Sequence, residues 1–424
     1  MSRGPSRRAF TAALCGSGLA LASPLARPAL AQASPKVVVV GGGFAGATAA
    51  RALRRGGTDV TLVEPRDSYV ACPLSNSVIA GLRPMEAQLF GYDALRRDGI
   101  AIARSAATAV DIEGRRVTLA DGNVLTYDRL VLAPGIDLNL EAIPGYDRAA
   151  AEVLPHAWQA GPQTLLLRDQ LTAMEDGGTV VMTVPANPYR CPPGPYERAS
   201  LIAHYLKTRK PRSKLIVLDA KDVFSKQRLF QAAWQELYPQ HLEYVPLAAG
   251  GAVASVDPGP RTVATDFERY RADVANIIPP QRAGRIAAVA GAADRSGWCP
   301  VDPVTFESRL SPNIHVIGDA AIGGAVPKSA FAANAEAKVC AAAILDLFAR
   351  RRPQSPKLVN TCYSLVAPAY GISVAGVYRP ANGLLADVEG AGGTSPLGAP
   401  PEMRVLEAGY AEDWFRTITG EVFG

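Results

Sequence analysis

The chain has 424 residues, of which 48% are apolar and 20% are charged, and its formal net charge is +5. This length exceeds what one hydrophobic core usually holds, so we expect two closely joined domains. Residues 1–33 contain four arginines and no acidic residue, and removing them leaves a net charge of +1 (5 − 4). The positive charge therefore gives no reason to expect a nucleic-acid partner.

Residues 1–33 predict an export signal. Arg7 and Arg8 precede an uncharged segment rich in Ala and Leu, and residues 31–33 (Ala-Gln-Ala) offer a small-residue cleavage site. The arginine pair is typical of a twin-arginine signal, which predicts a periplasmic location and folding before export. The alternative is an ordinary secretory leader. No later uncharged apolar run approaches the roughly 20 residues of a membrane span.

The stretch from Lys36 to Glu64 predicts a dinucleotide-binding unit. A β-branched apolar strand is followed by Gly41, Gly43 and Gly46, then by an Ala-rich helix and a second strand. The glycines allow a tight turn, a close approach to a pyrophosphate and close packing of the helix on the strand. The phosphate then lies at the helix N-terminus, and Glu64 binds ribose hydroxyls. This order of elements is far more specific than a lone glycine motif.

Further residues of the predicted cofactor site flank this unit. They are Phe44 and Ala45 between the glycines, and Pro65 and Arg66 directly after Glu64. The turn-rich segment that follows, which includes Cys72, is expected to lie along an extended cofactor. After a hairpin over 112–119, a buried strand ends in Ala133-Pro134-Gly135, which resembles the Ala-Thr-Gly segment of flavoproteins with two dinucleotide domains.

A second nucleotide-type unit follows without the expected glycine motif. A helix over 164–175 and a strand over 178–184 lead into residues 185–195, which include five prolines. Proline has a fixed φ and no N–H donor, so this segment cannot form a phosphate-binding nest. A helix over 197–207 and a strand over 214–219 complete the unit. We therefore expect no NAD(P).

The last third of the chain returns to the first domain and then adds a smaller one. A strand over 313–320 ends in Gly318-Asp319, and Lys328 and Ser329 open a helix that ends near residue 347. Strands over 358–378 and a flexible link over 390–401 precede a tail that contains Trp414. Weak periodicity and few basic residues argue against a membrane-binding helix in this tail.

Together these motifs resemble the flavoprotein subunit of flavocytochrome c sulfide dehydrogenase. The resemblance covers nearly the whole chain after residue 33, and it is carried by the first glycine motif, Ala71-Cys72-Pro73, Ala133-Pro134-Gly135, the segment 188–194, the segment 298–302, Gly318-Asp319 and Cys362. It implies FAD attached through an 8α-thioether to Cys72, and a redox disulfide between Cys191 and Cys362. It also implies sulfide as substrate and a c-type cytochrome as partner.

The cysteine count is compatible with this resemblance. Five cysteines remain once Cys15 leaves with the export signal, so at least one lies outside any intrachain disulfide. Cys299 and Cys340 are expected to be structural. The chain has no CxxC pair, so no metal site is predicted, and it has no CxxCH motif, so it carries no c-type haem of its own.

The predicted chemistry is attack of hydrosulfide on the Cys191–Cys362 disulfide, which leaves a persulfide and a thiolate. Lys328 and the helix that it opens are expected to stabilise negative charge on the reduced flavin. Glu197 is a candidate acid or base, with an ordinary helix acid as the alternative.

The predicted fold class is α/β, with two Rossmann-like dinucleotide-binding domains and a smaller α+β C-terminal domain. The expected boundaries are 34–150 with 284–350 for the FAD domain, 151–283 for the second domain, and 351–424 for the C-terminal domain with a partner-docking tail. The predicted function is periplasmic oxidation of sulfide to zero-valent sulfur or polysulfide. A sulfide:quinone oxidoreductase and a non-catalytic electron-transfer flavoprotein are the alternatives.

Overall fold

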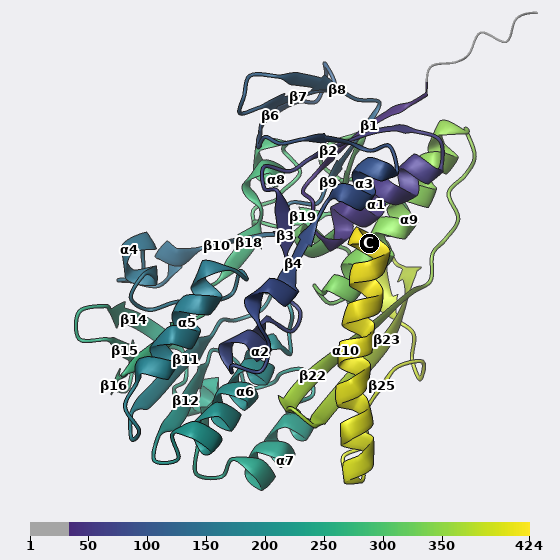
Figure 1. Ribbon diagram of the computed structural model, residues 1–424. Helices are drawn as coiled ribbons and strands as arrows, with labels where there is room; N and C mark the ends of the chain where they lie inside the picture. Colours follow the sequence, from purple (N-terminus) through teal and green to yellow (C-terminus); the bar gives the residue numbers. More distant parts are fainter. Residues whose placement is uncertain (1–33) are drawn as a thin grey trace, which may run out of the picture. The chain divides into compact units, whose positions relative to one another are not determined.

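The computed structural model describes residues 34–424, so the predicted export signal over 1–33 lies outside the described residues. Two parallel sheets and one antiparallel sheet organise the described chain, and helices cover them (Figure 1). This arrangement confirms the predicted fold class.

The first sheet is the predicted dinucleotide-binding sheet. Its strands run in the order β20-β9-β1-β2-β5, and every neighbouring pair is parallel. The strands are β1 (Lys36–Val40), β2 (Asp59–Val63), β5 (Ala101–Ala103), β9 (Arg129–Leu132) and β20 (Ile314–Val316). Helix α1 (Phe44–Arg55) packs against α9 (Ala330–Phe348), which begins at the predicted cap because Ser329 Oγ accepts a hydrogen bond from Ala332 N (3.0 Å).

The second sheet has the predicted nucleotide-domain plan, with parallel strands in the order β13-β12-β11-β17. The strands are β11 (Thr179–Val184), β12 (Lys214–Asp219), β13 (Leu242–Val245) and β17 (Val274–Ile277). Its main helices are α5 (Pro162–Ala173), α6 (Gly194–Arg209) and α7 (Gln227–Leu237). Strands β10 (Ile136–Leu138) and β18 (Gln281–Ala283) pair antiparallel where the chain passes between the two sheets.

The antiparallel sheet of the C-terminal part consists of β22 (Leu358–Ala367), β23 (Tyr370–Ala381), β24 (Leu384–Asp387) and β25 (Gly393–Thr394). The tail after residue 400 forms one long helix, α10 (Pro401–Phe423), whose weak periodicity had not predicted it. This helix packs on β22, β23 and α1. Trp414, which is partly buried, stacks on Phe331, and Phe415 is buried.

The remaining elements are short. They are β3 (Ser68–Val70), α2 (Ser75–Ile79), η1 (Met85–Gln88), β4 (Leu89–Gly91), α3 (Asp93–Arg97), β6 (Ala107–Asp111), β7 (Arg116–Leu119), β8 (Val124–Thr126), η2 (Leu140–Ala142), α4 (Arg148–Ala151), η3 (Leu247–Ala249), β14 (Val253–Asp257), β15 (Thr262–Thr265), β16 (Arg269–Arg271), α8 (Arg285–Val289), β19 (Cys299–Pro300), η4 (Gly318–Ala320) and β21 (Ala321–Ile322). None of the helices in residues 34–424 combines the length and apolarity that crossing a membrane requires.

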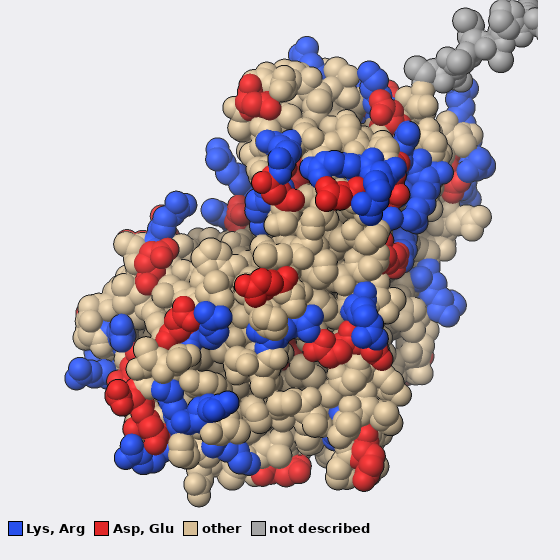
Figure 2. Space-filling model, viewed as in Figure 1, with Lys and Arg blue, Asp and Glu red and all other residues tan. Residues whose placement is uncertain are grey.

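Surface charge agrees with the small net charge of this part of the chain. On the face shown in Figure 2, basic and acidic side chains are interspersed over the elements of both parallel sheets.

The glycine turn after β1 depends on backbone contacts that no side chain would allow. Gly41 has a φ of +102°, and a Cβ there would overlap the carbonyl oxygen of Ala133. A Cβ at Gly46 would overlap the carbonyl oxygen of Gly41, and backbone atoms cannot move aside as a flexible side chain can. Gly46 therefore sets how closely α1 packs on β1, as the sequence predicted.

We predict that Gly46→Ala lowers the melting temperature, because overpacking of this kind typically costs about 1–3 kcal/mol. Gly409→Ala is the matched control, since Gly409 lies in α10 with open space around it and alanine is the better helix former by about 0.5–1 kcal/mol. In thermal unfolding, the melting temperature of Gly409→Ala should therefore equal or exceed that of wild type, and the melting temperature of Gly46→Ala should be well below it. A Gly46→Ala protein as stable as wild type would contradict the packing argument.

Candidate active site

A cavity of about 540 Å³ brings the predicted site residues together. Its wall begins at the glycine turn, passes the ends of β2, β9 and β20, and reaches the segment before α6, the middle of β22 and α10. The cavity is therefore built where the carboxyl ends of the first sheet's strands meet the other two parts of the fold.

The buried Glu64 carboxylate holds the nucleotide end of this cavity in shape. Glu64 Oε2 accepts a hydrogen bond from Gly42 N (2.9 Å), and Oε1 accepts from Arg66 N (3.1 Å) and Arg66 Nε (3.0 Å). Both Glu64 and Arg66 line the cavity, whereas Pro65 does not. The acid predicted to bind ribose is thus in place beside the glycine turn.

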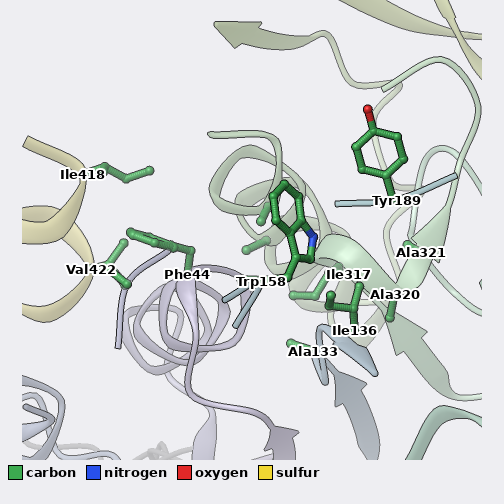
Figure 3. Close-up of a cluster of buried hydrophobic side chains, with 14 of the residues drawn as sticks. Phe44, Ala133, Ile136, Trp158, Tyr189, Ile317, Ala320, Ala321, Ile418 and Val422 are labelled. Carbon is green, nitrogen blue, oxygen red and sulfur yellow. The ribbon is translucent and has the colours of Figure 1, made fainter. Parts of the chain in front are cut away.

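The middle of the cavity is lined by Phe44, Ala45, the Ala133-Pro134-Gly135 segment and Gly318-Asp319. Figure 3 shows Phe44 facing Val422 of α10, with Ala133 and Ile317 below Trp158. Asp319 is enclosed, and its burial raises the pKa of its carboxyl. Gly43 lines the cavity as predicted, and Gly46 supports the turn from outside the wall.

The three cysteines that the resemblance singles out all line this one cavity, although they lie far apart in the sequence. Cys72 follows β3, Cys191 lies three residues before the start of α6 at Gly194, and Cys362 lies in β22. All three are free thiols in the structure. The structure thus brings the three cysteines to one cavity. The disulfide between Cys191 and Cys362 remains a prediction.

The backbone fixes Cys191 in an uncommon conformation. Its φ is +56°, its N donates to Lys328 O (2.7 Å), and its O accepts from Gly194 N (2.8 Å). Burial raises the pKa of the Cys191 thiol, and negative charge on Cys362 and Glu197 raises it further. The Cys362 sulfur differs, because it accepts a hydrogen bond from Asn360 Nδ2 (3.3 Å).

Glu197 connects the two elements that carry these cysteines. It lies in the first turn of α6, and its Oε1 accepts from Leu365 N of β22 (2.9 Å) while its Oε2 accepts from Asn76 Nδ2 (2.7 Å). Burial raises the pKa of this carboxyl. Since each oxygen already faces an N–H donor, the geometry favours a positioning role for Glu197 over acid–base work.

Lys328 does not lie where we expected it. Its ammonium donates to Asp319 O (2.8 Å) and Ala321 O (2.6 Å), and it lies 4.0 Å from the Trp298 ring centroid. Lys328 is absent from the cavity wall, because these backbone carbonyls and the indole draw its side chain beneath η4. Lys328 therefore acts on the cavity through its positive charge and not by direct contact. Burial lowers the pKa of Lys328 to about 8.

Sequence reasoning missed a buried polar cluster beside the cysteines. Arg198 donates to the carbonyls of His156 and Ala157 and to the side chains of Asn76 and Asn276. These partners come from separate segments without a shared motif, and the only sequence signal is the adjacency of Arg198 to Glu197.

Trp158 and Arg190 also line the cavity. The Trp158 indole Nε1 is buried without a protein partner. Cys299 and Cys340 are buried free thiols outside the cavity wall, as expected of structural cysteines. Residues 34–424 contain no cluster of His, Cys, Asp and Glu suited to a metal ion.

The cavity residues fit an extended dinucleotide. Gly41, Gly42 and Gly43 line the cavity without side chains, and Glu64 lies beside them at the ribose position. A pyrophosphate at the turn and a flavin ring beside the cysteines would occupy such a cavity from end to end. The fold and the cavity thus have the layout of a flavoprotein oxidoreductase with two dinucleotide-binding domains.

Known protein families match three segments of the chain. Residues 35–164 match the pyridine nucleotide-disulphide oxidoreductases. Residues 164–279 match the central part of the sulfide dehydrogenase (flavocytochrome c) flavoprotein chain, and residues 354–423 match the flavin-binding part of flavocytochrome c sulphide dehydrogenase. The flavoprotein chain of sulfide dehydrogenase from Chlorobaculum thiosulfatiphilum is 56% identical over 45 residues, which are 10% of this chain and 94% of that relative. The chain belongs to the flavocytochrome c sulfide dehydrogenase flavoprotein family.

Other relatives share only part of their length with this chain. A probable ferredoxin reductase from Castellaniella defragrans is 33% identical over 163 residues, which are 37% of this chain and 40% of the relative. The sulfide:quinone oxidoreductase structure from Aquifex aeolicus superposes with a TM-score of 0.73 at 17% identity, over 92% of each chain. At that identity the likeness shows the fold alone, and it agrees with the predicted two-domain α/β plan.

His156 provides a test of the electrostatics of the cavity wall. Its Nδ1 accepts from Trp158 N (3.0 Å), and burial together with Arg198 and Arg190 lowers the pKa of His156 to about 4. The unfolded chain therefore binds a proton near pH 6.5 that the folded chain resists, so stability is lost as the pH falls from about 6.5 toward about 4.

We predict that His156→Asn, which keeps an acceptor for Trp158 N, reduces this loss. At low pH, the lowered pKa of His156 reduces the free energy of unfolding by at most about 3 kcal/mol. The measurement is the fall in melting temperature between pH 7 and pH 5, which should be smaller in the variant than in wild type. Equal falls in the two proteins would show that His156 is not buried as a neutral ring.

Proposed function

We propose that the chain is the FAD-dependent subunit of a periplasmic sulfide dehydrogenase, which oxidises sulfide to zero-valent sulfur or polysulfide and passes electrons to a c-type cytochrome. The observation that carries this proposal is the convergence of Cys191 and Cys362 on the cavity lined by the predicted FAD-binding residues. Two thiols from different parts of the fold beside a flavin site are what a redox disulfide requires.

The residues that would hold FAD follow the cavity from end to end. The glycine turn and the N-terminus of α1 suit the pyrophosphate, and Glu64 suits the adenosine ribose. FAD, when bound, supplies a two-electron acceptor beside the cysteines. Ala133-Pro134-Gly135 and Gly318 offer close backbone approach along the middle of the cavity.

The protein's own chemistry is thiol–disulfide exchange. Hydrosulfide attacks one sulfur of an oxidised Cys191–Cys362 pair, a new sulfur–sulfur bond forms as the disulfide bond breaks, and the electron pair of the broken bond leaves on the other cysteine as a thiolate. Across the full cycle, HS⁻ loses two electrons and one proton to give zero-valent sulfur. The pair must be held together throughout, and the Glu197 bridge between α6 and β22 serves that purpose.

The second nucleotide domain supports the proposal that no NAD(P) is used. The prolines over 185–195 are one reason. A second is that the carboxylate at the end of β12 is already hydrogen-bonded by side chains of the same domain. Asp219 is fully buried and accepts hydrogen bonds from Lys221 Nζ (2.6 Å), Tyr196 OH (2.7 Å) and Tyr244 OH (3.0 Å). In a working nucleotide site this position would be free for ribose hydroxyls.

An exported flavoprotein without NAD(P) needs another electron acceptor, and the family supports a cytochrome. Helix α10 is a suitable docking element. Ala411 and Trp414 line the cavity, and Met403, Leu406 and Tyr410 continue at helical spacing as an exposed apolar stripe. The arginine pair in residues 1–33 supports the periplasmic location.

We predict that Cys191→Ser and Cys362→Ser each slow flavin reduction by sulfide by several orders of magnitude, because either change removes the disulfide. Stopped-flow absorbance of the flavin measures the rate. Cys340→Ala is the matched control, since Cys340 is a buried thiol in α9 outside the cavity, and it should reduce at the wild-type rate. NADH in place of sulfide should leave the flavin oxidised. Unchanged kinetics in either serine variant would refute the disulfide role.

We also predict that FAD is bound covalently to Cys72, which lines the cavity after β3. Acid precipitation of wild type should leave the flavin in the pellet, and peptide mass analysis should place it on the Cys72 peptide. Cys72→Ser should release all of its flavin into the supernatant. Complete release from the wild-type protein would exclude the thioether.

Turnover with different acceptors separates the proposal from the quinone alternative. We expect sulfide-dependent reduction of a co-purified c-type cytochrome and little reduction of a soluble quinone analogue. Leu406→Glu in the α10 stripe should raise the KM for the cytochrome at least severalfold without changing flavin reduction by sulfide. Efficient turnover with quinone and none with cytochrome would favour a sulfide:quinone oxidoreductase.

A further inference from the structure

Lys226 is a buried lysine that the redox chemistry above does not use. It precedes α7 with a φ of +61°, and its side chain enters the C-terminal sheet. Its Nζ donates to Cys362 O (3.0 Å), Ser364 Oγ (2.7 Å) and, more weakly, Ile372 O (3.4 Å). These three partners are uncharged, and the ion pairs within residues 34–424 do not include Lys226. A buried ammonium with only neutral ligands is costly unless a negative charge lies nearby.

The acidic side chains that face Lys226 come from three elements packed around it. They are Cys362 of β22, Glu197 of α6 with the preceding Cys191, and Glu407 of α10. Burial lowers the pKa of Lys226 to about 8, and these groups oppose that shift, with Cys362 exerting the largest effect. Lys226 is therefore cationic at neutral pH and loses its charge as the pH rises past about 8.

Two of these groups already have donors of their own. Glu197 accepts from a backbone N–H and an amide, as described above. Glu407 accepts from Ser373 Oγ (2.9 Å), from Ser395 Oγ and from Arg404 Nη1 (3.2 Å). The Cys362 sulfur has only the Asn360 amide, so it is the group for which the Lys226 charge matters most.

Cys191 lies in surroundings that disfavour a thiolate. Although it precedes α6, residues 192, 193 and 195 are prolines without N–H donors, and Gly194 N already donates to Cys191 O. The helix N-terminus therefore offers the Cys191 sulfur little of the usual anion stabilisation. Burial and the negative charge of Glu197 also raise the pKa of the Cys191 thiol.

We infer that Lys226, together with Asn360, is a positioning residue that stabilises negative charge arriving on the Cys362 sulfur, which makes Cys362 the leaving sulfur and Cys191 the sulfur that hydrosulfide attacks. The new bond joins the substrate sulfur to Cys191 Sγ, the bond between the two cysteines breaks, and its electron pair goes to Cys362 Sγ. The sulfur that is more stable as a thiolate leaves faster. This inference rests on the proposed disulfide chemistry and assigns the two cysteines different roles within it.

Alkylation of the reduced full-length holoprotein tests the inference without turnover. Iodoacetamide is applied over a range of pH, and peptide mass spectrometry reports Cys362 and Cys191 separately. In wild type, Cys362 should react with a lower pH midpoint than Cys191. Lys226→Met should slow alkylation of Cys362 about tenfold at pH 7, because it removes the nearby positive charge. Lys226→Arg keeps the cation and should retain most of the wild-type rate.

Lys207→Met is the control, because Lys207 is a lysine on α6 whose Nζ donates to one backbone carbonyl, Leu237 O (2.9 Å), and it lies outside the cavity wall. Its alkylation profile should match wild type. A lower midpoint for Cys191 than for Cys362 in wild type would overturn the inference, even if Lys226→Met failed to fold. The inference would also be overturned if Lys226→Met left the alkylation profile of Cys362 unchanged. It would be overturned as well if Cys362 were alkylated as slowly in Lys226→Arg as in Lys226→Met. Sulfide kinetics are measured separately, so failure of the proposed function would leave these profiles intact.

Discussion

The site depends on one buried carboxylate that ties together parts of the fold distant in sequence. Glu197 accepts hydrogen bonds from the backbone of β22 and from Asn76, so α6, β22 and the segment after Cys72 are fixed relative to one another. A buried carboxylate is stable only when its lone pairs are satisfied, so the three elements must keep this arrangement. The shared cavity of Cys72, Cys191 and Cys362 is the consequence.

Around this bridge, the protein uses buried cations in two ways. Arg198 and Lys328 are bound mainly by backbone carbonyls and amides, and they join segments of the cavity wall. Lys226 is bound in the same manner, but its two closest ligands lie on the strand that carries Cys362. A positive charge held by neutral ligands keeps its field available to a nearby sulfur, whereas a carboxylate partner would cancel much of it.

The second nucleotide domain keeps the expected fold, whereas the segment after its first strand has different chemistry. Its parallel strands and helices have the expected order, but prolines replace the glycine turn and Asp219 is enclosed by Lys221 and two tyrosines. The domain instead presents Cys191 and Glu197 to the cavity from the start of α6. The start of α6 is thus part of the wall of the cavity that the three cysteines line.

The sequence by itself determined the features that depend on local chemistry. β-Branched runs predicted the parallel strands, Gly41 and Gly46 predicted the turn, and Ser329 predicted a helix cap, because each follows from the backbone preferences of a few adjacent residues. Tertiary structure alone decided the rest. The weakly periodic tail became α10 because β22, β23 and α1 offer it a surface to pack on, and Lys328 turned toward carbonyls that lie beneath η4. Lys226, Asn76 and Arg198 carry no motif, since their roles come from partners that only folding brings within hydrogen-bonding distance.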